Sequence, residues 1–141
     1  MNPEQSEHAG PPIGEAPVSE FKSKSGLKRI LSAFSYSVAG LRTAWTHEHA
    51  FRQELILVAV GAAVALALPI SAYQKLLLIG VLLLVLIVEL INSAIEAVVD
   101  RISLERHPLS KNAKDLGSAA VLLSLILAGL SWAVVLFDRF Y

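Results

Sequence analysis

Three long apolar runs constrain what this chain of 141 residues can fold into. They cover residues 55–72, 76–99 and 116–137, and the third contains no charged residue. A hydrocarbon core about 30 Å thick requires about 20 consecutive apolar residues in each crossing helix. Hydrophobic residues make up 55% of the chain and charged residues only 17%, a balance that soluble domains of this length rarely show. The sequence therefore predicts an all-α membrane protein with three transmembrane helices.

The segments before the first run differ from each other. Residues 1–25 are rich in Pro, Gly, Ser, Glu and Lys and show no apolar period, which predicts a disordered cytoplasmic tail. In residues 26–54, apolar side chains recur every three or four positions, as in Leu27, Ile30 and Phe34. This spacing predicts an amphipathic helix at the membrane surface, with an ordinary soluble helix as the alternative. Residues 26–141 would then form one membrane domain, with a loop at 100–115.

Basic residues are distributed unevenly along the chain. Only Lys75 and Arg139 lie between the first two runs or after the third. The others are Lys22, Lys24, Lys28, Arg29, Arg42, Arg52, Arg101, Arg106, Lys111 and Lys114. Because cytoplasmic segments carry the excess of Lys and Arg, we expect the N-terminus and the 100–115 loop in the cytoplasm and the C-terminus outside.

Polar residues interrupt the second half of the second run. At about 100° per residue, Glu96 and Asp100 both fall within about 20° of Glu89 on a helix, and Asn92 and Ser93 flank the same stripe. Asn92 and Ser93 alone would fit helix packing. An acidic residue near the middle of the bilayer opposes insertion by roughly 2.5–3.5 kcal/mol, and the neighbouring runs offer no basic partner at that depth. The stripe therefore indicates a function for Glu89 and Glu96.

The depths of the two glutamates suggest phosphoryl transfer. A carboxylate in a low-dielectric environment is more basic than in water and can remove the proton of a hydroxyl group. A second carboxylate near the aqueous edge can hold Mg²⁺, which takes oxygen ligands and bridges substrate phosphates. The basic 100–115 loop would lie where a nucleotide arrives, with Lys114 near a phosphate. We expect transfer from a soluble donor to a membrane-embedded alcohol.

Several stretches together resemble one known family. ELINSAIEAVVDR (89–101), His107 and AKDLGSAAV (113–121) resemble the signature of prokaryotic diacylglycerol kinases, and GLRTAWTHEHAFRQE (40–54) is similar to the family's surface helix. The resemblance extends from about Lys28 to the C-terminus. It implies a homotrimer in the bacterial inner membrane, with active sites shared between subunits and the C-terminus in the periplasm. The implied reaction converts ATP and diacylglycerol into phosphatidic acid.

The resemblance also implies roles for individual residues. Glu89 would be the catalytic base, supported by Asn92, while Glu48 and Glu96 would hold Mg²⁺ on ATP. Further nucleotide contacts would come from Tyr36, Glu105, Arg106, His107, Lys114 and Asp115. The lipid site would be lined by Arg29, Arg42, Trp45, Phe51, Arg52, Gln53, Glu54, Glu89 and Ser118. Pro108 replaces the acidic residue that usually follows the loop histidine, which leaves any contact by that side chain in question.

Other functions fit part of the sequence. A sister branch of the family phosphorylates undecaprenol, although 40–45 and 50–54 resemble the diacylglycerol branch more closely. From a different class, a small ion channel or proton-linked transporter would use the intramembrane glutamates to conduct ions. A third alternative is an assembly subunit whose polar stripe binds a partner helix. The channel or transporter alternative leaves the basic loop and the surface helix unexplained.

Overall fold

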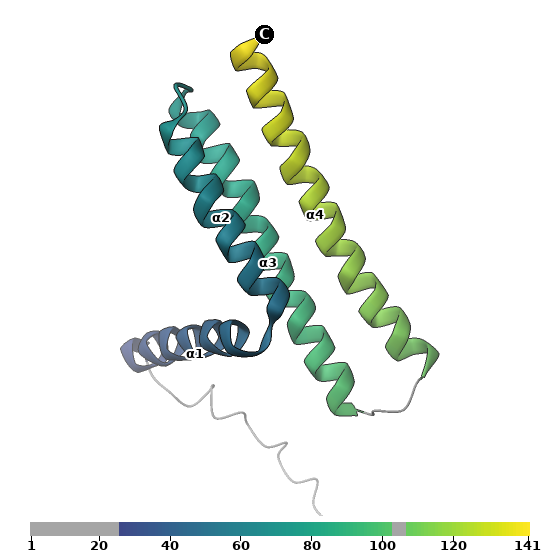
Figure 1. The fold of residues 1–141 in the computed structure, drawn as a ribbon. Helices are drawn as coiled ribbons and strands as arrows, with labels where there is room; N and C mark the ends of the chain where they lie inside the picture. The colour runs from purple at the N-terminus through teal and green to yellow at the C-terminus, as the bar shows by residue number, and fades with distance from the viewer. Residues whose placement is uncertain (1–25, 103–106) are drawn as a thin grey trace, which may run out of the picture. The chain divides into compact units, whose positions relative to one another are not determined.

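The computed structural model describes residues 26–102 and 107–141, and all secondary structure in those ranges is α-helical. Helix α1 spans Gly26–His47, α2 spans His49–Ala67, α3 spans Ala72–Ile102 and α4 spans Pro108–Phe140 (Figure 1). The predicted all-α class is confirmed. The expected tail, residues 1–25, lies outside the described residues.

Helices α2, α3 and α4 are each long and apolar enough to cross a membrane, as predicted. At about 1.5 Å per residue, the 31 residues of α3 extend about 46 Å, which exceeds a hydrocarbon core of about 30 Å. Helix α4, with 33 residues, is slightly longer. Both helices therefore have room for aqueous ends beyond an apolar centre.

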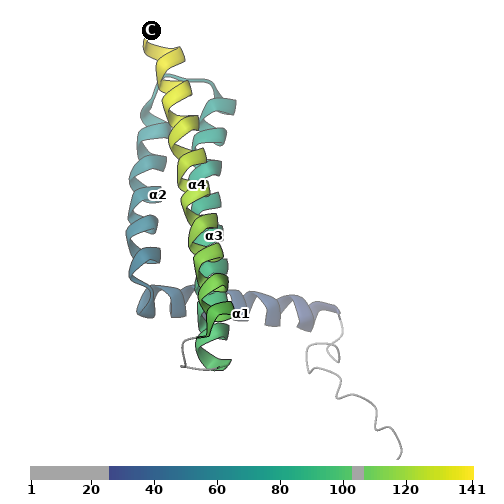
Figure 2. The same cartoon turned by 90° about the vertical axis from the view of Figure 1, so that its right-hand side faces the viewer.

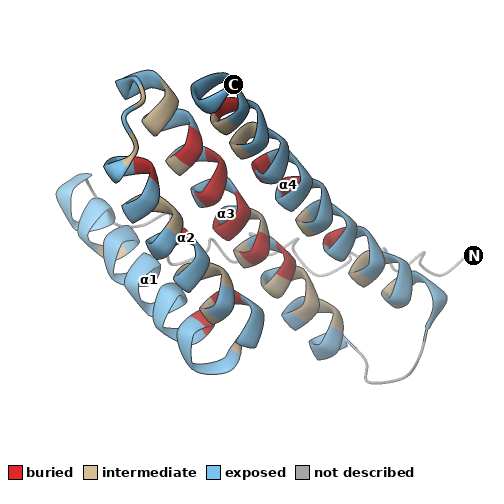
Figure 3. Ribbon diagram, turned by 45° about the horizontal axis from the view of Figure 1, so that its top comes forward, coloured by how far each residue is buried: buried red, intermediate tan, exposed pale blue. Residues whose placement is uncertain are grey.

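Chain contacts divide the protein after Val38 into two units. Residues 26–38 of the first unit are helical. The second unit, Ala39–Tyr141, contains the end of α1 and all of α2, α3 and α4. Within it, α3 packs against both α2 and α4, and the views in Figures 2 and 3 show these three helices side by side.

The core of the second unit is concentrated on α3 (Figure 3). Leu78 and Val85 are almost completely buried, and the buried positions of α4 are small or β-branched, which lets the two helices approach closely. Those α4 positions are Gly117, Ser124, Ala128 and Val135. Trp132 of α4 also donates from Nε1 to the Leu78 carbonyl oxygen at 3.4 Å. Packing of α2 and α4 onto α3 thus fixes which face of α3 is covered.

The first apolar helix ends earlier than the expected residue 72. Helix α2 stops at Ala67, because Pro69 lacks an N–H donor and disfavours helical geometry in the residue before it. Ser71 and Gln74 then form a reciprocal cap for α3: the Gln74 N–H donates to Ser71 Oγ (3.2 Å), and the Ser71 N–H donates to Gln74 Oε1 (2.9 Å). The turn therefore lies at 68–71, earlier than the gap between the first two predicted apolar runs.

Two basic side chains hold this turn in place. Lys75 Nζ donates to the Leu66 carbonyl oxygen at 2.7 Å, and Arg139 Nε donates to the Pro69 carbonyl oxygen at 2.9 Å. The last carbonyl groups of a helix lack partners within the helix, and cationic donors there also interact favourably with the helix dipole. Lys75 thus caps the end of α2, and Arg139 holds the turn that follows it.

The expected surface helix, 26–54, is not continuous. Helix α1 ends at His47, Glu48 adopts an extended conformation (φ −100°, ψ 112°), and α2 begins at His49. Residues 49–54 therefore belong to the first apolar helix. The break falls within the polar triplet 47–49, and no Gly or Pro marks it, which is why the sequence pattern alone did not locate it.

The expected 100–115 loop is also shorter in the structure. Helix α3 continues to Ile102 and α4 begins at Pro108, where the fixed φ of proline suits the first turn of a helix. His107 caps this helix, since its Nδ1 accepts a hydrogen bond from the Leu109 N–H at 3.2 Å. Residues 103–106, including Glu105 and Arg106, lie outside the described residues.

Candidate active site

The polar stripe of α3 becomes progressively more exposed toward the end of the helix. Glu89 and Asn92 are buried, with exposed fractions of 5% and 8%, Glu96 is half-buried and Asp100 is exposed. The helical period predicted that these residues share one face, and α2 and α4 cover the inner part of that face. The stripe therefore joins a buried carboxyl group to the aqueous end of the helix.

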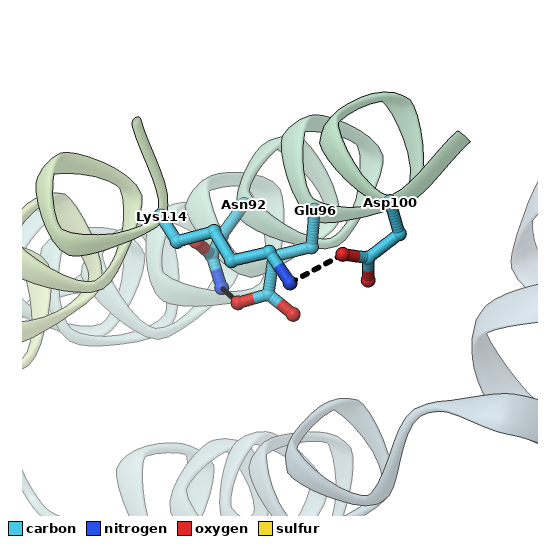
Figure 4. A network of polar contacts seen from close by, with 4 residues as sticks. All are labelled: Asn92, Glu96, Asp100 and Lys114. Carbon is cyan, nitrogen blue, oxygen red and sulfur yellow. Dashed lines mark hydrogen bonds and ion pairs between the residues drawn. The ribbon is translucent and has the colours of Figure 1, made fainter. Parts of the chain in front are cut away.

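Asn92 connects the carboxyl groups along the stripe. Its Nδ2 donates to Glu96 Oε1 at 3.3 Å, and its side chain also interacts favourably with the Glu89 carboxyl group. Figure 4 shows Asn92, Glu96 and Asp100 projecting from α3 beside the Lys114 side chain of α4. Among the described residues, Asn92 Oδ1 is buried without a hydrogen-bond partner. One amide group thus orients two carboxyl groups.

Glu48 and Glu54 bring further carboxyl groups toward Glu89. Glu89 interacts electrostatically with Glu96 and Glu48, and Glu54 interacts with Glu89. Glu48 is half-buried at the break between α1 and α2, and its side chain makes no capping hydrogen bond there. Glu54 Oε2 is buried and has no hydrogen-bond partner among the described residues. The fold therefore gathers four glutamates from α2, α3 and the helix break.

Arg52 stabilises the helix break beside Glu48. Its Nη1 donates to the carbonyl oxygens of Trp45 (2.8 Å) and Thr46 (3.4 Å), and its Nη2 lies 2.7 Å from His49 Nδ1. These carbonyl groups belong to the last turn of α1, which has no following helical residues to satisfy them. Arg52, expected at the lipid site, thus has a structural role that orients the chain around Glu48.

Lys114 bridges the aqueous ends of α3 and α4. Its Nζ lies 2.6 Å from Asp100 Oδ1, and it also interacts electrostatically with Glu96 (Figure 4). Asp115, one residue further on, pairs with Lys111 on the same helix at 2.5 Å. The structure therefore places Lys114 next to the carboxyl stripe, while Asp115 and the capping residue His107 are exposed and occupied by local contacts.

The residues expected at the lipid site do not all lie on an open surface. Phe51 is 4% exposed and packs in the apolar cluster with Val58, Val85 and Ala128. In contrast, Arg42, Trp45, Gln53 and Ser118 are exposed. Arg29 and Tyr36 lie in the first unit, on the N-terminal part of α1.

Two residues missing from the predicted site contribute to its geometry. The sequence places Asp100 on the polar stripe without indicating a role for it, yet it binds Lys114. Gly117 was not singled out, and a Cβ atom at this position would overlap Asn92 Oδ1. The placement of Gly117 three residues after Lys114 was a signal for a shared α3–α4 contact, since residues three apart lie on the same side of a helix.

The site offers oxygen donors suited to a hard cation. Glu48 has no capping hydrogen bond, and within the part of the chain that the structure describes the Asn92 amide donates to just one of the two Glu96 oxygens. Within residues 26–102 and 107–141, no three His, Asp or Glu side chains form a group that could hold a metal alone. Mg²⁺ typically uses one or two carboxylates and completes its coordination with water and substrate phosphates, so the donor set fits a magnesium–nucleotide complex.

Comparison with known proteins identifies the family. The family model for prokaryotic diacylglycerol kinase matches residues 35–136. A diacylglycerol kinase of Pseudomonas aeruginosa is 56% identical over 118 residues, which cover 84% of this chain and 96% of the relative. The diacylglycerol kinase of Escherichia coli is 50% identical over 116 residues (82% and 95%), and that of Haemophilus influenzae is 42% identical over 113 residues (80% and 96%). This chain therefore belongs to the prokaryotic diacylglycerol kinase family.

Proposed function

We propose that this protein phosphorylates diacylglycerol to phosphatidic acid in the bacterial inner membrane, using ATP as the phosphoryl donor. The main support is the buried Glu89 carboxyl group, which interacts with Glu96 and Glu48 in a chain that is 56% identical to a diacylglycerol kinase. A kinase needs one base at the alcohol and acidic groups at the nucleotide, and these residues meet both requirements. The family assignment argues against the channel and assembly-subunit alternatives.

In the proposed reaction, Glu89 accepts the proton of the lipid hydroxyl group. The hydroxyl oxygen forms a bond to the γ-phosphorus of ATP, the bond between that phosphorus and the β–γ bridging oxygen breaks, and ADP leaves with the bonding electrons. Asn92 holds the Glu89 and Glu96 carboxyl groups in a fixed relation during this step. Because Glu89 is buried, water is excluded from the base.

Glu48 and Glu96 are the residues that would hold Mg²⁺ with the nucleotide. When bound, the ion would neutralise charge on the phosphate oxygens. Lys114, kept beside Glu96 by Asp100, adds a positive charge at the same end of α3. Tyr36, Glu105, Arg106, His107 and Asp115 are the further nucleotide contacts that we propose.

The membrane arrangement is part of the same proposal. We infer that the apolar face of α1 lies at the cytoplasmic surface, that α2, α3 and α4 cross the bilayer, and that three subunits share their active sites. Leu27, Ile30 and Phe34 fall on one face of α1, as an interfacial helix requires. The N-terminus would be cytoplasmic and the C-terminus periplasmic, as the distribution of basic residues indicates.

A lipid-specific kinase assay tests the proposal. Purified protein in mixed micelles is given radiolabelled ATP and Mg²⁺ with either diacylglycerol or undecaprenol as the acceptor. We expect labelled phosphatidic acid, little transfer to undecaprenol and no transfer when Mg²⁺ is chelated. Faster phosphorylation of undecaprenol would assign the other lipid, and ATP-independent ion flux without transfer to either lipid would contradict a kinase.

A further inference from the structure

The side chain of Asn92 lies against Gly117 of α4, a position at which any larger residue would collide with it. A Cβ atom built on Gly117 would overlap Asn92 Oδ1 and would lie 3.3 Å from Asn92 Cγ and 3.9 Å from its Cα. Gly117 is buried, so α4 passes directly against the polar stripe at this point. The space that glycine leaves empty is therefore occupied by the amide group of Asn92.

That amide group has little freedom to move. Asn92 is 8% exposed, and its Nδ2 already donates to Glu96 Oε1. A methyl group at residue 117 would push against Oδ1, and rotation of the amide in response would carry Nδ2 away from the Glu96 carboxyl group to which it donates. Rotation inside a packed helix interface is also costly.

We propose that Gly117 is a positioning residue of the active site, which acts through Asn92 to align the Glu89 and Glu96 carboxyl groups. The inference rests on the proposed function, because it assigns those carboxyl groups to the base and the magnesium–nucleotide complex. It differs from simple helix packing, since the atom that approaches residue 117 most closely is a polar oxygen of the stripe and not an aliphatic carbon.

The first test compares two glycines of the same helix. In Gly117→Ala, we expect kcat to fall about tenfold or more and the Mg²⁺ concentration for half-maximal activity to rise, because displacements of about 1 Å are enough for such losses. Gly129→Ala is the control, since a Cβ atom there has no neighbour within 4 Å, and it should match the wild type. Wild-type kcat and Mg²⁺ dependence in Gly117→Ala would overturn the inference.

A double-mutant cycle separates positioning from packing. Asn92→Ala removes the amide that the new methyl group would strike, so adding Gly117→Ala to Asn92→Ala should cause no further loss of kcat. A full additional loss would overturn the inference. If Gly117→Ala alone does not fold, folding of the double variant with the activity of Asn92→Ala supports the proposal, whereas misfolding of both contradicts it.

A binding measurement keeps this test separate from the proposed function. Isothermal titration of the full-length protein with MgATP should show weaker binding in Gly117→Ala than in Gly129→Ala, whatever lipid is phosphorylated. Wild-type protein that binds MgATP but does not phosphorylate diacylglycerol would contradict the proposed function alone. Equal MgATP affinity in the two variants, together with equal kcat, would contradict the positioning role alone.

Discussion

Glu89 is an acidic residue that lies buried in an apolar helix, although such a residue opposes insertion into a membrane. The residue is 5% exposed, and its carboxyl group interacts electrostatically with other acidic residues and favourably with Asn92. The described residues place no cation against it, so the fold does not use Glu89 in an ion pair there. A buried acid without a cationic partner is more readily explained by chemistry than by stability.

At this scale we expect Glu89→Gln to reduce kcat by about 10²-fold or more, because an amide has the same shape but cannot accept the proton. Steady-state kinetics in mixed micelles measure the loss. Asp138→Asn makes the same acid-to-amide change at the other end of the bundle, where Asp138 accepts a hydrogen bond from Gln74 at 3.4 Å, and should leave kcat unchanged. A Glu89→Gln enzyme with wild-type turnover would remove Glu89 from the role of base.

Among the helices, the junction of α1 and α2 shows how local geometry serves the site. Glu48 leaves helical geometry there, and the Arg52 guanidinium group satisfies the carbonyl groups of Trp45 and Thr46. The sequence predicted both residues as parts of the site but not the break between the two helices. At the break, Arg52 contacts a residue seven positions earlier, and helical periodicity does not encode such a contact.

We expect Arg52→Gln to lower the melting temperature, because the shorter side chain cannot reach both carbonyl groups. The loss of unfolding free energy should be about 1 kcal/mol, the usual net value of such hydrogen bonds. Thermal unfolding followed by circular dichroism in detergent measures it. Arg101→Gln, an exposed change near the end of α3, serves as the control. Equal destabilisation by both variants would mean that the Arg52 contacts do not stabilise the break.

For the molecule as a whole, orientation in the membrane decides which end of α3 meets the nucleotide. The stripe opens toward Asp100 and Lys114, and Lys75 and Arg139 cap the opposite end. Ten of the twelve basic residues belong to segments that we assign to the cytoplasm, where ATP is available. Both the charge distribution and the position of the open end of the stripe favour the orientation that we propose.

Cysteine labelling tests this orientation, because the chain contains no cysteine. In intact spheroplasts, we expect a membrane-impermeant maleimide to label Tyr141→Cys, whose position is 96% exposed at the C-terminus. Lys28→Cys should be labelled only after the membrane is permeabilised. The reverse pattern would place the carboxyl stripe at the periplasmic end, away from ATP, and would contradict the proposed orientation.

The sequence by itself determined the helical class, the three apolar helices, the shared face of Glu89 and Glu96, and the family. These features follow from the period of a helix and from runs of residue type, both local properties of the chain. Only the tertiary structure placed Gly117 against Asn92, Glu48 within range of Glu89 and Phe51 in the apolar cluster. Such neighbours depend on how each helix is rotated and shifted against the next, and that choice comes from packing across helices, which no single segment encodes.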